Sequence, residues 1–273
     1  MYTALKINRL KQSILTACLL LIAWAPLSTY ANDAGNSSPI TSLSFAAANW
    51  CPYSCVDANY PGFVTEAMRH ALTKYDITLS VTILPWTRAI KMTEQGKFDA
   101  LLTAIPTEAP GFHLTEKPSG QYQMCLFSLP ESSFTYKDRI SFKGLVLGAI
   151  QDYGYGKPID DMIKRPLPNE QVYSLSSSDP LHSLVEMVHK NRIDTFVEDR
   201  FVVKNYLKKN NHRQLKNSGC LEAVPFFTAI SPSYKNHKEA IILLNKVLNS
   251  DDYKLRYTQA QQRYSPQSQA TLN

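Results

Sequence analysis

The sequence has 273 residues, of which 44% are hydrophobic, 11% aromatic and 19% charged, with 10 Gly and 16 Pro. This length suits one large domain or two modest ones with a well-buried core, and the composition excludes a disordered, collagen-like or coiled-coil chain. The net charge is +6, and it falls by three, to +3, without the basic residues of an N-terminal segment that carries no acid. So mild a charge does not indicate a nucleic-acid partner.

The N-terminal segment has the pattern of an export signal. An apolar run at 14–27 follows three basic residues, Lys6, Arg9 and Lys11. Small residues stand three and one positions before a cut after Ala31, so we predict a signal peptide at 1–31 and a mature chain in the periplasm. An uncleaved membrane anchor is the alternative, although the run is short for a bilayer span. Cys18 is not assigned as a lipidation site, because most of the apolar run follows it.

Four cysteines remain after the predicted cut: Cys51, Cys55, Cys125 and Cys220. In an oxidising compartment an even number indicates two disulfides, with three possible pairings. The segment 51–55 is similar to the Cys-Pro-Tyr-Cys site of glutaredoxins, but three residues separate its cysteines and no helix follows directly. We therefore favour a structural disulfide there over a catalytic dithiol.

The hydrophobic pattern predicts two successive rounds of strand and helix. The first round has strands at 43–48, 77–84 and 98–103 and helices at 62–72 and 86–95, then a loop at 111–120 and a strand at 121–129. The second has strands at 145–150, 171–175, 193–197 and 223–230, and helices near Pro158, after the cap Asp179 and at 201–207, 238–248 and 251–263. Such alternation predicts an α/β protein with mainly parallel sheets.

The motifs of the common enzyme classes are missing. The sequence has no Gly-x-Ser-x-Gly elbow, no phosphate-binding loop and no complete dinucleotide fingerprint. His182 and His189 share a helix face but lie about 10 Å apart along it, too far for one metal ion. We therefore predict neither a metal nor a cofactor. Glu198 and Asp199 form either an acid–base pair, a surface pair, or one ligand contact and one helix cap at Asp199.

Six segments carry a family resemblance: 50–53, 62–66, 84–89, 96–100, 144–156 and 192–199. Their order and spacing resemble the polar-amino-acid family of periplasmic solute-binding proteins of ABC transporters, from about Ser42 to Tyr264. The resemblance implies the two-lobe (type II) periplasmic binding protein fold. In it, two crossing hinge strands join lobes that each hold a mainly parallel sheet flanked by helices. The implied lobes are 32–123 with 226–273, and 124–225.

Candidate ligand-binding residues follow from the ends of the predicted strands. Ligands of open parallel sheets bind beyond the carboxyl ends of the strands, and the residues placed there are Trp50, Tyr53, Trp86, Thr103, Tyr153, Tyr155, Glu198 and Asp199. Asp199 matches the family acid that holds the amine of the ligand. For the aromatic residues, packing in the core is the alternative role.

One departure from the family concerns the ligand carboxylate. Amino-acid binders of this family place an Arg shortly after the third strand, where its forked guanidinium holds the carboxylate. The corresponding stretch here is 107–111, and no Arg occurs between Arg88 and Arg139. Arg88 either supplies the missing charge or belongs to a solvated helix face or an ion pair within the lobe. The sequence therefore argues against an α-amino-acid ligand.

The sequence leads to one expected function and two alternatives. We expect an exported, monomeric, non-enzymatic receptor for a small polar solute, working with a membrane ABC permease or, alternatively, a membrane sensor. The other alternative is a periplasmic enzyme that resembles cyclohexadienyl dehydratase, with Glu198 or Asp199 as acid–base. Side-by-side hinge strands would pair Cys125 with Cys220, which leaves Cys51 with Cys55.

Overall fold

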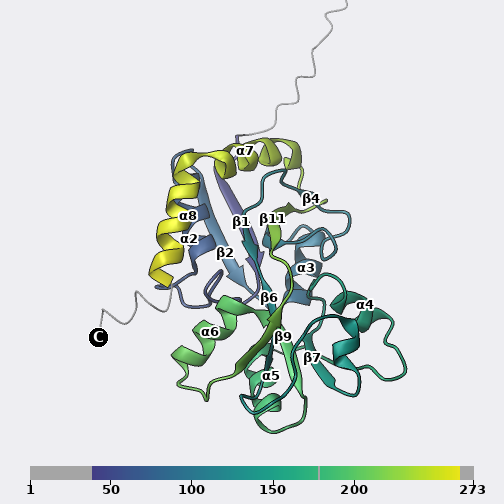
Figure 1. Ribbon diagram of the computed structural model, residues 1–273. Helices are drawn as coiled ribbons and strands as arrows, with labels where there is room; N and C mark the ends of the chain where they lie inside the picture. The colour runs from purple at the N-terminus through teal and green to yellow at the C-terminus, as the bar shows by residue number, and fades with distance from the viewer. Residues whose placement is uncertain (1–38, 178, 265–273) are drawn as a thin grey trace, which may run out of the picture. The chain divides into compact units, whose positions relative to one another are not determined.

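The computed structural model describes residues 39–177 and 179–264 (Figure 1). The predicted signal peptide at 1–31, the cut after Ala31 and Cys18 lie outside the described residues. Within the described ranges, none of the helices combines the length and the apolar character that crossing a membrane requires.

The first sheet has the strand order β2-β1-β3-β11-β4, and β5 pairs with β11. β1 is parallel to β2 and β3, whereas β11 runs antiparallel to β3. Its strands are β1 (Ser42–Ala47), β2 (Thr78–Ile83), β3 (Ala100–Ala104), β4 (His113–Leu114), β5 (Gly120–Tyr122) and β11 (Val224–Ile230). Every residue of β3 is buried, and its sequence, apolar except for Thr103, is typical of a strand covered on both faces.

Four helices accompany the first sheet: α2 (Phe63–Thr73), α3 (Trp86–Glu94), α7 (His237–Asn249) and α8 (Asp251–Tyr264). Val64, Ala67, Met68 and Ala71 are buried on one face of α2, because their spacing matches the helical period. α8 lies beside α2 in Figure 1, and the two helices pack against each other.

The second sheet has the strand order β10-β6-β9-β7-β8. β7 is parallel to β8 and β9, and β6 runs antiparallel to β9. The order β8-β7-β9-β6 thus repeats β2-β1-β3-β11, and the predicted α/β fold with two similar sheets is confirmed. Both sheets are mixed rather than mainly parallel, because β11 and β6 add antiparallel pairs to the parallel pairs that β1 and β7 make. The strands are β6 (Met124–Ser128), β7 (Val146–Ile150), β8 (Gln171–Leu175), β9 (Thr195–Asp199) and β10 (Lys216–Cys220). The helices are η1 (Arg139–Phe142), α4 (Ile159–Lys164), α5 (Pro180–His189) and α6 (Arg200–Lys209).

Two differences from the predicted elements lie between the sheets. The predicted strand at 121–129 is two strands, β5 and β6, separated by Gln123, whose backbone N–H donates to Asp199 Oδ2 at 2.9 Å. β10 was not predicted, because its sequence Lys-Asn-Ser-Gly-Cys has no apolar alternation. Antiparallel pairing with β6 makes it a strand, so tertiary contact decides here over local propensity.

The chain passes between the two sheets twice, at Gln123 and again between Cys220 and Val224. The strands around these points pair with each other, β5 with β11 and β6 with β10. A disulfide joins Cys125 to Cys220, which lie opposite each other on β6 and β10. A second joins Cys51 to Cys55 in the loop after β1. Both pairs are those expected from the sequence.

The two disulfides close loops of very different length, with sequence separations of 95 and 4 residues. Removing the long crosslink frees more conformations of the unfolded chain. We expect the double variant C125A/C220A to lower the free energy of unfolding by about 2–4 kcal/mol, and C51A/C55A to lower it less. Urea unfolding of both variants measures this. Equal losses would contradict a stabilising role for the crosslink between β6 and β10.

Candidate ligand-binding site

The candidate site is a cavity between segments of the two sheets. Its volume is about 30 Å³, which admits about two water molecules, because one water needs on the order of 10–15 Å³. The lining residues come from chain segments at the carboxyl ends of parallel strands, from the start of α3 and from the crossing strands. They are Ala48, Trp50, Trp86, Thr103, Ala104, Ile105, Glu108, Tyr122, Met124, Tyr153, Gly154 and Phe226.

Aromatic rings form much of the wall. Trp50 stacks on Tyr53 with ring centroids 4.2 Å apart, and the edges of Tyr122 and Phe226 meet it at 5.6 and 5.9 Å. Trp50 is held in place by the loop that the Cys51–Cys55 bridge closes. Such packed rings keep water out and offer π faces to a bound molecule.

Glu108 supplies the one acidic side chain among the lining residues. Its Oε1 accepts the backbone N–H of Gly154 at 2.7 Å, and its Oε2 accepts that of Ile105 at 3.0 Å. Burial raises the pKa of Glu108 to about 7, against the lowering effect of these two N–H groups. The nearby Trp86 indole also lowers it slightly, although Trp86 Nε1 makes no hydrogen bond of normal geometry within the described residues.

Glu198, at the end of β9, lies directly behind Trp50. Its Oε1 accepts the indole N–H of Trp50 at 3.0 Å and the backbone N–H of Asp199 at 2.7 Å. Burial raises the pKa of Glu198 to about 7. Since Trp50 follows β1 in the first sheet and Glu198 belongs to the second, this bond joins the two sides of the cavity.

Asp199 is the N-cap of α6, the capping role that the sequence offered for it. Its Oδ1 accepts the backbone N–H groups of Phe201 and Val202, and its Oδ2 accepts that of Gln123. Burial raises the pKa of Asp199 to about 6. Glu198 and Asp199 are both fully buried, so they do not form a surface pair.

The structure brings together four of the nine residues selected from the sequence: Trp50, Trp86, Thr103 and Tyr153 line the cavity. Tyr53 and Tyr155 are buried beside it, and the Tyr155 hydroxyl bonds to the backbone of Ile150. Glu198 and Asp199 lie outside the lining, and Arg88 is an exposed residue of α3 that does not line the cavity.

Glu108 is the functional candidate that the sequence analysis missed. It stands in the stretch 107–111, where the family resemblance places the carboxylate-binding Arg, so a signal was present. The resemblance points to a missing positive charge in this stretch, whereas the structure places a half-buried carboxyl there, at the cavity.

Three hydrogen bonds, in addition to that of Trp50 with Glu198, close the cavity across the two sheets. Besides the Glu108–Gly154 bond, the Tyr122 hydroxyl donates to Gly154 O at 3.0 Å and the Thr87 hydroxyl donates to Asp152 Oδ2 at 2.6 Å. Two wider grooves, of about 730 and 320 Å³, both border Thr87 and Tyr153. A solute larger than a few atoms therefore needs these bonds to open before it can enter.

Solved structures of solute-binding and sensor proteins share this architecture. An ancestral arginine-binding protein is 17% identical, with 82% of this chain and 98% of its own matched at a TM-score of 0.68. An ancestral amino acid-binding protein, a precursor of cyclohexadienyl dehydratase, is 18% identical over 82% of this chain and 95% of its own, at 0.63. A histidine kinase sensor domain with similarity to periplasmic binding proteins is 13% identical over 83% and 97%, at 0.69.

The chain has the periplasmic binding protein fold. The fold that the six segments implied is thereby confirmed. No protein-family profile matches the sequence. No curated protein matches it in sequence either.

The raised pKa values of Glu108 and Glu198 predict how stability depends on pH. Each pKa is about 7 in the folded protein against an ordinary value of 4.5, so between these values the folded state binds more protons than the unfolded one. The free energy of unfolding must then fall as pH rises through this window. We expect a contribution on the order of 1–2 kcal/mol per glutamate between pH 5 and 7.

Urea unfolding at several pH values measures this for the wild type and for E108Q/E198Q. The variant should lose this fall, while the exposed-site control E116Q should keep it. A variant with the same pH profile as the wild type would show that the two carboxyls titrate normally.

Proposed function

We propose that the protein is an exported, non-enzymatic receptor that captures a small organic cation between two lobes. The observation that carries this proposal is the carboxyl of half-buried Glu108, which lines an aromatic cavity and has a raised pKa. No Lys, Arg or His occurs among the described residues that line that cavity. A carboxylate withdrawn from water is stabilised by hydrogen-bond donors or by a positive partner. Glu108 has two backbone N–H donors, and inside this cavity a cationic ligand would add the positive partner.

The chemistry of the walls supports a cation with an apolar body. Trp50, Trp86 and Tyr153 offer π faces to an ammonium or guanidinium group, which such rings attract most strongly where water is excluded. A primary amine, a diamine or a quaternary ammonium compound has this character. The same cation would hold Glu108 in its ionised form, which burial alone disfavours.

An α-amino acid fits the cavity less well. Its carboxylate would need a cationic or multiply donating partner, and Arg88 is exposed and outside the lining. The arginine-binding protein of similar fold binds arginine, so a cationic group in a ligand is compatible with this architecture. The stretch 107–111 carries Glu108 where the family resemblance places an Arg, which favours a ligand without the carboxylate.

Capture requires the two sides of the cavity to separate and close. We propose 32–123 with 226–273 as one lobe and 124–225 as the other, turning about the chain crossings at Gln123 and between Cys220 and Val224. Opening breaks the hydrogen bonds across the cavity, which join Gly154 to Glu108 and Tyr122 and join Asp152 to Thr87. Domain closure of this hinged kind is a common route to ligand capture.

The protein would work in the periplasm, to which the predicted signal peptide would direct it before being removed. There the mature chain would be a monomer. The two disulfides fit an oxidising compartment. A membrane ABC permease would receive the solute. A histidine kinase sensor domain has a similar fold, which supports reporting to a membrane sensor as the other use of the same capture.

An enzyme is the second candidate, because two carboxyls near a closed cavity have a pKa of about 7. Groups with such values suit general acid–base catalysis at neutral pH, and a precursor of cyclohexadienyl dehydratase has a similar fold. Ligand recovered unchanged after long incubation with the protein supports the receptor. Conversion that is lost in E108Q or E198Q would establish the enzyme.

A thermal-shift screen tests the ligand class. We expect monoamines, diamines or quaternary ammonium compounds to raise the melting temperature, and sugars, carboxylic acids and α-amino acids of equal size to raise it less. For the best cation, E108Q should weaken binding at least tenfold, about 1.4 kcal/mol. W86A should weaken it by on the order of 1–3 kcal/mol through lost stacking.

Calorimetry on these variants has two controls, R88A and E116Q, which change exposed residues and should bind as the wild type does. Affinity of the wild type should rise as pH increases from 6 to 8, because Glu108 must be ionised to pair with the cation. A best ligand that carries no positive charge, or an E108Q variant of full affinity, would contradict the proposal.

Asp199 gives a separate test, because its carboxylate already accepts three backbone N–H groups. D199N should lower the free energy of unfolding by about 0.5–2 kcal/mol through the weakened cap, and it should leave ligand affinity within twofold of the wild type. Melting curves and calorimetry on the same preparation measure both. A large loss of affinity at normal stability would instead place Asp199 on the amine of the ligand.

A further inference from the structure

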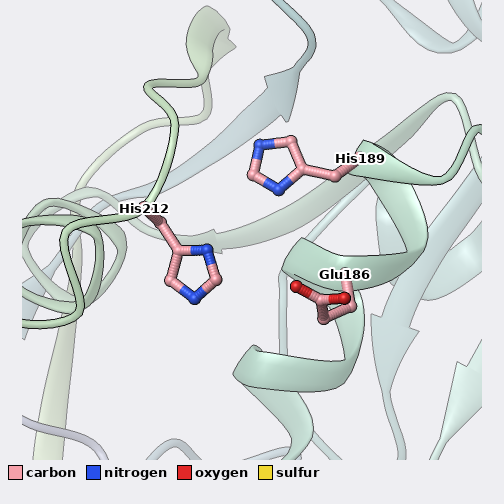
Figure 2. Close-up of side chains that lie close together, drawn as sticks. All are labelled: Glu186, His189 and His212. Atoms are coloured by element: carbon pink, nitrogen blue, oxygen red, sulfur yellow. The ribbon is translucent and has the colours of Figure 1, made fainter.

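A second cluster of polar side chains lies in the part of the chain that forms the second sheet, apart from the cavity. Glu186 and His189 are three residues apart on α5, so they share one helix face, and His212 follows the end of α6. One nitrogen or oxygen atom from each lies within 4.8 Å of the others. Figure 2 shows the two imidazole rings and the carboxylate turned toward a common space.

His189 has one ring nitrogen without a hydrogen-bond partner in the part of the chain that the structure describes. Its Nε2 is buried and has no hydrogen-bond partner among residues 39–177 and 179–264. A buried ring nitrogen with no partner is unfavourable, and each such group in a folded protein requires an explanation. Because Nε2 points away from Glu186 and His212, the nitrogen of His189 that can meet an ion in this cluster is Nδ1 (Figure 2).

Hydrogen bonds orient the second histidine. The hydroxyl of Tyr206 lies 3.2 Å from Nε2 of His212 and 2.7 Å from Nδ1 of His182. Since Tyr206 occupies Nε2, Nδ1 is the nitrogen of His212 that remains for an ion. Outer hydrogen bonds of this kind fix the ring orientation of histidines that ligate metals.

We propose that Glu186, His189 and His212 form a binding site for a divalent transition-metal ion such as Zn²⁺. Two imidazoles and one carboxylate are a ligand set that zinc uses in proteins, with water in the fourth position; Cu²⁺ and Ni²⁺ favour the same donors. Donor atoms around a tetrahedral zinc ion lie about 3.3 Å apart, so small side-chain rotations draw this cluster together.

Two neighbouring charges bear on the site. Lys190 bonds Glu186 at 2.7 Å, and Arg213 bonds Glu131. Because Lys190 is exposed, it can leave the carboxylate when the ion binds. The ion would then join α5 to the segment between α6 and β10, which leads to the Cys125–Cys220 bridge.

This site cannot be predicted from the sequence, because among its two histidines and their neighbours only His182 and His189 share a predicted helix. His212 lies beyond β9 and α6 in sequence. The fold brings it to α5, where it faces Glu186 and His189 (Figure 2). The site is independent of the proposed solute cavity, since none of its three ligands lines that cavity.

Zinc titration of the untagged mature protein tests the proposal, by calorimetry and by competition with a chromophoric chelator. We expect one Zn²⁺ per chain and a melting temperature that rises with zinc concentration. H189Q and H212Q should each weaken binding by more than tenfold, since even loss of an outer partner costs 10–100-fold. E186Q should weaken it less.

The matched control is H237Q, which removes an imidazole that stacks on His113 at 4.4 Å, far along the chain from this cluster. It should bind zinc as the wild type does. Melting curves without metal show whether each variant is folded. If a histidine variant does not fold, the zinc affinity of E186Q tests the site in its place. Absence of stoichiometric zinc binding by the wild type would overturn the site. Equal binding by the wild type, H189Q and H212Q would overturn it too, as would loss of binding in H237Q alone.

Discussion

Two carboxyl groups between the sheets, those of fully buried Glu198 and half-buried Glu108, constrain the rest of this structure. A buried carboxylate is tolerated only with hydrogen-bond donors or a positive partner close by. Glu108 receives backbone N–H groups from Ile105 and Gly154, and Glu198 receives one backbone N–H and the Trp50 indole. Two of these bonds, Gly154 to Glu108 and Trp50 to Glu198, join a segment of one sheet to a segment of the other. These two hydrogen bonds to the carboxyls therefore form only when the two sides of the cavity come together.

This arrangement links protonation, closure and ligand charge. With no cation in the cavity, burial favours the protonated forms, and this raises the pKa of both glutamates to about 7. When the cavity opens, water can stabilise the ionised forms again. A cation that enters pairs with Glu108, so the closed state can then hold the ionised carboxylate. A neutral or anionic solute cannot pair with the Glu108 carboxylate in this way. The closed state is therefore stabilised only by a solute that carries a positive charge.

Much of the fold could be predicted from the sequence, because it follows from local patterns. The apolar spacing on α2 and the cap at Asp179 are set by residues close in the chain, and the structure has both. β10 could not be predicted, since its polar residues become a strand only by pairing with β6. The break at Gln123 was hidden for a similar reason, because its N–H bonds a carboxylate 76 residues away.

The site was harder to predict than the fold. Position after a strand selects Trp50 and Trp86, which line the cavity, but it selects the buried core residue Tyr155 equally well. Only the packing separates them. Gly154 shows the same limit: a Cβ there would collide with the side chain of Ile105, and its N–H reaches Glu108. Nothing in the local sequence reports that approach between segments about 50 residues apart.

The most direct test of the central claim is a crystal structure of the protein purified from the periplasm without unfolding, so that its natural ligand stays bound. The account predicts a molecule between Trp50 and Trp86 with a positively charged nitrogen within hydrogen-bond distance of the Glu108 carboxylate. A ligand that turns a carboxylate toward Glu108, or one that binds there with no positive group, would contradict it.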